Sequence, residues 1–165
     1  MGTPSASRRI ELSQALPASS ADAWATLTDL EGWPRWGRLV TAAQGELIPG
    51  AVWRMTLRGV GGGPPRTMRP TLLRVEAPSV LEFETRIGAA WVARMTHAFA
   101  LEATGPDSCV LRQSFAITGL LVAPLWRWLE PGMRQFDALG QDLARALAEA
   151  TAPPSSPPRA PAGAE

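Results

Sequence analysis

The feature that most constrains the fold is a long amphipathic pattern near the C-terminus. At about 100° per residue, the apolar positions of residues 125–147 fall on one arc of about 120°. This arc contains Leu125, Leu129, Gly132, Met133, Phe136, Leu139, Gly140, Leu143 and Leu147, and the polar arc contains Arg127, Glu130, Arg134, Asp137, Gln141, Asp142, Arg145 and Glu149. The pattern predicts one long helix, bent at Pro131, that must bury its apolar face against another element.

The segment before this helix alternates with period two, which is typical of strands with one buried face. Turn residues such as Pro49-Gly50 and Gly105-Pro106 divide it into consecutive runs, so we expect an antiparallel meander over residues 40–117. The run 67–76 is ambiguous, because both of its phases mix apolar and polar residues and Pro70 does not fit a central strand.

The N-terminal part predicts one strand from residue 8 and two short helical segments, at residues 21–30 and 32–38, and Ser19 with Asp22 forms the start signature of the first helix. The whole is an α+β fold, in which a curved antiparallel sheet of about seven strands wraps around the long C-terminal helix. Residues 8–150 form this single domain. We expect residues 1–7 to be a flexible N-terminus and residues 151–165, rich in Pro and Ala, to be a disordered tail.

Composition and charge exclude several classes of protein. The net charge is +1 and the basic residues, all arginine, are dispersed, so a nucleic-acid partner is not expected. A single cysteine excludes an internal disulfide, and the first 20 residues lack the apolar core of a signal peptide. The longest apolar stretch, residues 119–125, is far shorter than the roughly 20 residues of a spanning helix. We therefore expect a cytoplasmic protein without stable membrane insertion.

Apolar side chains gather where the sheet and the helix must face each other. The inward strand phases and the helix arc supply the candidate ligand-binding residues Trp53, Met55, Phe83, Thr85, Met95, His97, Phe99, Gln113, Phe115, Met133, Phe136 and Gly140. A mostly apolar lining with a few polar groups is typical of small-molecule pockets. Gly132 and Gly140, within the helix arc, indicate either empty volume above the sheet or close helix-to-sheet packing.

His97 is the only histidine and lies on an inward strand phase. It is the one candidate catalytic residue, as a general acid or base in an apolar pocket; alternatively it is a core histidine that bonds to a neighbour. No second histidine or cysteine is present, and Glu82 and Glu84 point outward, so neither a metal nor a cofactor is predicted.

Several stretches match one superfamily in order along the chain. They are Asp22 and Trp24, Trp33 and Trp36, Pro49-Gly50, Arg69-Pro70-Thr71, His97-x-Phe99-x-Leu101, and Phe115 followed by residues 119–122 and Pro124. The chain thereby resembles the START/Bet v 1-like (SRPBCC) superfamily, in particular its bacterial polyketide cyclase/dehydrase and lipid-transport-like members. The resemblance implies a helix-grip fold with a hydrophobic cavity. Gly140 stands where relatives often have asparagine, and the absence of tyrosine excludes the tyrosine-based proton transfer of cyclase relatives.

Three functions are compatible with these observations. The first is binding of a small hydrophobic or aromatic molecule, lipid-like or polyketide-like, in a cavity between the sheet and the C-terminal helix. The second is a cyclase or dehydratase reaction that uses His97 as general acid/base. The third is a dimerising interaction domain without ligand, which would associate through Trp126 and Trp128. The sequence leaves open whether the chain is an enzyme and whether it is a monomer or a homodimer.

Overall fold

The computed structural model describes residues 6–59, 62–89 and 92–152. Most of the predicted flexible N-terminus and of the predicted tail therefore lies outside the described residues. The elements are β1 (Ala6–Leu16), α1 (Ser20–Thr28), the 3-10 turn η1 (Leu30–Gly32), α2 (Trp33–Trp36), β2 (Val40–Gln44), β3 (Arg54–Leu57), β4 (Arg66–Met68), β5 (Thr71–Glu76), β6 (Val80–Ile87), β7 (Ala93–Gly105), β8 (Ser108–Gly119), α3 (Val122–Arg134) and α4 (Asp137–Thr151).

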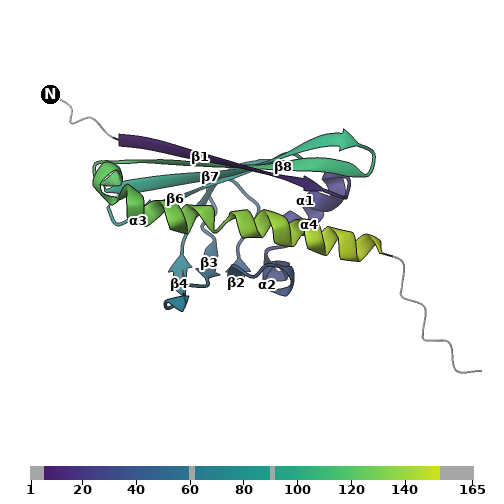
Figure 1. Cartoon of the computed structure of the whole chain (residues 1–165), viewed down its shortest axis with the longest axis horizontal. Helices are drawn as coiled ribbons and strands as arrows, with labels where there is room; N and C mark the ends of the chain where they lie inside the picture. Colours follow the sequence, from purple (N-terminus) through teal and green to yellow (C-terminus); the bar gives the residue numbers. More distant parts are fainter. Residues whose placement is uncertain (1–5, 60–61, 90–91, 153–165) are drawn as a thin grey trace, which may run out of the picture.

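The strands form two antiparallel groups that continue into each other. The larger has the order β1-β8-β7-β6-β5 and the smaller the order β2-β3-β4. A bridge between Val52 and Thr71 joins them, with backbone bonds of 2.8 Å from Trp53 N to the Pro70 carbonyl and from Leu72 N to the Ala51 carbonyl. In Figure 1 the long strands lie on one side of α3 and α4 and the β2–β4 group lies on the other, so the sheet grips the helices.

Pro70 divides the run that was ambiguous in sequence. Its nitrogen carries no hydrogen and cannot donate to a ladder, so β4 ends at Met68 and β5 begins at Thr71. The sheet therefore has eight strands among the described residues, where the period-two pattern predicted about seven. The first helix starts as predicted, since the Ser19 hydroxyl accepts a bond from Asp22 N at 3.1 Å.

The C-terminal helix is interrupted at Gln135–Phe136, four residues beyond the predicted bend at Pro131. Pro131 stays inside α3, where its carbonyl accepts a bond from Gln135 N at 3.2 Å. The next bonds, from Phe136 N to the Met133 carbonyl and from Leu139 N to the Phe136 carbonyl, span three residues and tighten the chain. This turn directs the Phe136 side chain into the interior, where it is buried.

The helix faces differ from the amphipathic pattern in two places. Asp142, on the predicted polar arc, is only 1% exposed, because it accepts bonds from Arg38 N at 2.7 Å and from Arg38 Nε at 2.9 Å. These bonds tie α4 to the connection between α2 and β2. Conversely, Leu125 on the predicted apolar arc is 40% exposed and Trp128 is 72% exposed. The first half of α3 is thus less covered than α4.

Candidate functional site

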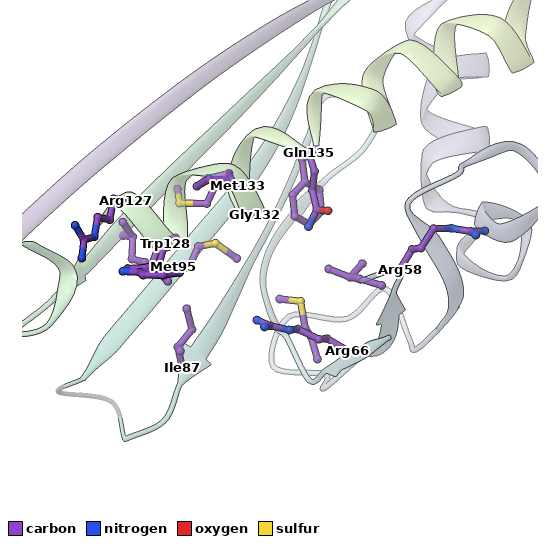
Figure 2. A pocket seen from close by; sticks show the side chains of 15 residues that line it. Arg58, Arg66, Ile87, Met95, Arg127, Trp128, Gly132, Met133 and Gln135 are labelled. Atoms are coloured by element: carbon purple, nitrogen blue, oxygen red, sulfur yellow. The ribbon is translucent and has the colours of Figure 1, made fainter. Parts of the chain in front are cut away.

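A largely apolar recess lies between α3 and the strand ends that face it, and we call it the α3 pocket (Figure 2). Its volume is about 400 Å³. The wall consists of Leu57, Arg58, Arg66, Met68, Ile87, Met95, Ile117, Arg127, Trp128, Leu129, Pro131, Gly132, Met133, Gln135 and Phe136. Among these described residues, three arginines and one glutamine are polar and none is acidic. Such a recess suits a small molecule with a large apolar part.

The two glycines of the helix arc have different surroundings. A Cβ built on Gly132 would meet no atom within 4 Å, so this glycine faces the open volume of the α3 pocket. A Cβ on Gly140 would lie 3.1 Å from Gln113 Nε2 and 3.3 Å from Gln14 Cβ. Both readings of the sequence therefore hold, one at each position: empty volume at Gly132 and close packing at Gly140.

This difference predicts opposite effects of the same substitution. Gly132→Ala should stabilise the protein by about 0.5–1 kcal/mol, because alanine favours the helix and the added methyl meets no neighbour. Gly140→Ala should destabilise it by about 0.5–1 kcal/mol, since Gln113 and Gln14 must move to admit the methyl. Urea unfolding of the two variants checks this, and equal shifts in the unfolding midpoint would contradict the assignment.

Three of the predicted ligand-binding residues, Met95, Met133 and Phe136, line the α3 pocket. The other nine do not: Trp53, Met55, Phe83, Thr85, His97, Phe99, Gln113, Phe115 and Gly140. They are buried in the core, where aromatic rings fill the space; the Trp53 and Phe83 centroids lie 5.6 Å apart, and those of Phe83 and Phe99 6.0 Å apart. The middle of the predicted container is thus occupied by its own side chains, and the recess lies at one end.

His97 lies inside this aromatic cluster and is fully buried. Its ring stacks on Phe115 with centroids 3.9 Å apart and contacts Phe136 edge-on at 5.1 Å. Neither ring nitrogen has a hydrogen-bond partner among the described residues. Burial lowers the pKa of His97 to about 3, although the neighbouring Gln113 amide acts in the opposite direction. The imidazole is therefore neutral near pH 7, and Phe136 contacts it from the pocket side.

Gln113 holds the helix interruption in place. Its Nε2 donates to the Phe136 carbonyl at 3.2 Å, a carbonyl at the turn between α3 and α4. Gln113 therefore binds the backbone of the helix turn and does not line the α3 pocket.

Arg66 is a charged residue of the wall that the sequence patterns missed, as they missed Met68 and Gln135. It precedes the ambiguous run, and three glycines and two prolines before it obscured where the strand begins. The signal that identifies it is the pairing register of β3 with β4, in which Arg66 lies opposite Leu57.

The described ranges contain no cluster of three or more His, Cys, Asp or Glu side chains that could hold a metal ion. In the same part of the chain, no helix has the length and apolar character needed to cross a bilayer.

The fold and the recess together define a helix-grip protein, an α+β class in which a curved antiparallel sheet surrounds a C-terminal helix. The chain belongs to the polyketide cyclase/dehydrase and lipid transport family, whose profile matches residues 7–151. It is thus a polyketide cyclase-like member of the START/Bet v 1-like superfamily, as its sequence motifs indicated.

Solved structures with the same fold are distant in sequence. A point mutant of norcoclaurine synthase from Thalictrum flavum, in complex with a transition state analogue, has a TM-score of 0.72 at 15% identity, over 92% of this chain and 100% of that one. A START superfamily protein from Mycobacterium smegmatis has a TM-score of 0.69 at 15% identity, over 87% of this chain and 99% of that one. The di-domain ARO/CYC StfQ from the steffimycin biosynthetic pathway has a TM-score of 0.68 at 16% identity, over 87% of this chain and 51% of that one. Comparison with curated proteins gave no match.

Proposed function

We propose that this protein binds a small hydrophobic molecule in the α3 pocket. The observation that supports this most directly is the open volume beside Gly132, a residue of a largely apolar wall. A volume of about 400 Å³ lies within the range of small-molecule sites. A glycine inside a helix costs about 1 kcal/mol relative to alanine, and a binding cavity is a reason to keep it there.

Exposed apolar side chains near the recess support the same proposal. Leu121, Leu125 and Trp128 are exposed on and before α3, and Trp128 also lines the pocket wall. An apolar ligand that enters beside them would cover part of a surface that water otherwise contacts.

Binding is better supported than acid–base catalysis. Two of the structural neighbours are, by their names, a synthase and an ARO/CYC, so an enzymatic function is the second candidate. In this chain, however, the described residues of the pocket wall include no histidine, cysteine or carboxylate. His97, the residue proposed as acid/base, lies behind Phe136 and has a pKa too low to exchange a proton near pH 7.

The interaction-domain alternative depends on the surface around α3. Trp126 is partly buried against the core, whereas Trp128 is exposed. The same exposed side chains would serve as a ligand entrance or as a dimer contact, and the oligomeric state of the protein distinguishes these two roles.

Filling the recess tests the proposed function. Gly132→Leu should place a side chain in the open volume and weaken binding of an uncharged apolar fluorophore, N-phenylnaphthylamine, by roughly tenfold or more, because contact area for the probe is lost. Gly132→Ala is the matched control, since its methyl occupies little of the volume. Fluorescence titration measures the affinity, and thermal melting reports whether each variant is folded.

Two results would contradict the proposal. One is the absence of fluorophore binding to the folded native chain; the other is equal affinity of the native, Ala and Leu proteins. Light scattering on the same samples gives the oligomeric state, and a dimer that dissociates on Trp128→Ser without any fluorophore binding would favour the interaction domain.

A further inference from the structure

Arg66 lies on the inner face of the sheet, where a charged residue is unusual. In the ladder between β3 and β4, Met55 is opposite Met68, Thr56 opposite Thr67 and Leu57 opposite Arg66. The Thr56 and Thr67 hydroxyls bond to each other at 3.2 Å on the outer face. Because side chains alternate along a strand, Arg66 shares the opposite face with the pocket-lining residues Leu57 and Met68.

The guanidinium group of Arg66 is directed into the recess. In Figure 2 it points from β4 toward the side of Met95 and Ile87, whereas the guanidinium of Arg58 points the opposite way. Arg58 Nε donates to the Arg38 carbonyl at 3.0 Å, and Arg127 lies over the Trp128 ring at 5.5 Å. The other two arginines of the wall therefore already have partners.

Arg66 makes no ion pair with any described residue. One acidic residue, Glu84, lines an adjoining surface depression together with Arg66. Glu84 is paired with Arg86 at 3.3 Å and with Arg94 at 3.4 Å. The positive charge of the pocket wall is thus not balanced within this part of the protein.

We propose that the natural ligand is an amphipathic acid, with an apolar body beneath α3 and a carboxylate or phosphate monoester bound by Arg66. This inference rests on the proposed function, because it assigns the chemistry of the molecule in the same pocket. The guanidinium fork matches two oxygens of either anion. Gln135, the neutral polar member of the wall, supplies an amide N–H within the same recess.

The exposure of Arg66 favours such a ligand. A fully buried arginine would lose much of its hydration when it pairs with an anion, and this cost offsets the attraction. Arg66 is exposed, so the anionic head can stay partly hydrated at the mouth while the apolar body is removed from water. An uncharged molecule of the same length would gain only the removal of its apolar body from water, and no pairing with Arg66.

Competition between an acid and an alcohol of equal length tests the inference. Decanoate and decanol, below their aggregation limits, are used to displace N-phenylnaphthylamine from the native chain, from Arg66→Gln and from Arg54→Gln. Arg54 is an exposed arginine of β3 outside the pocket wall, so its variant makes the same change in net charge. The native chain and Arg54→Gln should prefer decanoate by about tenfold, and Arg66→Gln should lose this preference while its affinity for decanol is kept.

The outcomes separate this inference from the proposed function. If the fluorophore binds but the two competitors displace it equally, or if Arg66→Gln and Arg54→Gln behave alike, the anion site is overturned while the apolar pocket stands. If the fluorophore does not bind, the pocket itself fails. Decyl phosphate in the same assay distinguishes the two head groups: stronger competition than decanoate assigns a phosphate monoester, and weaker competition assigns a carboxylate. Raising the salt concentration should reduce either preference.

Discussion

His97→Phe should make the folded protein less sensitive to acid than the native chain. The pKa of His97 is about 3 in the folded protein, against about 6.5 for an ordinary histidine. The unfolded chain therefore takes up the proton first as the pH falls. The contribution of His97 to the free energy of unfolding is fully present above about pH 6.5. It is lost progressively toward pH 3, by about 5 kcal/mol in total. Phenylalanine has no proton to bind, so this contribution to the pH dependence disappears.

At pH 7 the same substitution should cost little stability or increase it. Within the part of the chain that the structure describes, the imidazole nitrogens have no hydrogen-bond partners, and the ring lies among Phe83, Phe99, Phe115 and Phe136. An apolar ring of similar shape removes buried polar atoms without leaving a large cavity. A catalytic histidine would behave differently, since its replacement would remove turnover while the fold is unchanged.

Urea unfolding at pH 7 and pH 5 measures the effect. The native chain should lose about 2 kcal/mol more than His97→Phe between these values, because His97 protonates in its unfolded state only. Contributions from carboxylates are common to both proteins and cancel in the difference. An identical pH dependence of the two proteins would show that His97 keeps an ordinary pKa, and water or a partner would then reach the ring.

The sequence patterns identified the buried faces well but not how deep each face lies. Alternation placed Phe83, Phe99 and Phe115 on the inner face of the sheet, and all three are buried. It did not distinguish a side chain that fills the core from one that lines a recess, because both are apolar and point inward. The amphipathic pattern likewise placed Leu125 on the apolar side of α3, yet it is exposed.

Charged residues show the second limit of these patterns. Period alone assigns a charged side chain to solvent, as was predicted for Asp142. Asp142 is buried because Arg38, 104 residues earlier in the chain, supplies its partners. Arg66 is the converse, a charged residue on an inner face, which only the strand register reveals. Both depend on pairings between distant segments, and a local period contains no information on those pairings.

Asp142→Ala should destabilise the protein by about 3 kcal/mol. The carboxylate accepts bonds from two donors of Arg38, the backbone N–H and Nε, and Arg145 approaches it at 3.3 Å. Its removal leaves the partly buried N–H of Arg38 without an acceptor and breaks charge-assisted bonds, each worth about 1.5–3 kcal/mol. Asp142→Asn keeps one acceptor oxygen for that N–H, so it should cost less, about 1–2 kcal/mol. Urea unfolding at pH 7 compares the two variants.

Arg134→Gln is the control for a surface ion pair. Arg134 binds Glu130 at 2.8 Å on the exposed side of α3, and its loss should cost less than about 0.5 kcal/mol. If Asp142→Ala were no more destabilising than this control, the link between α4 and the α2–β2 connection would contribute little to the fold. The expected larger loss would instead show that α4 is anchored to this connection. The first half of α3 has no comparable bond to a strand among the described residues, so the anchored end of the helix is α4 and the less constrained end is the one above the α3 pocket.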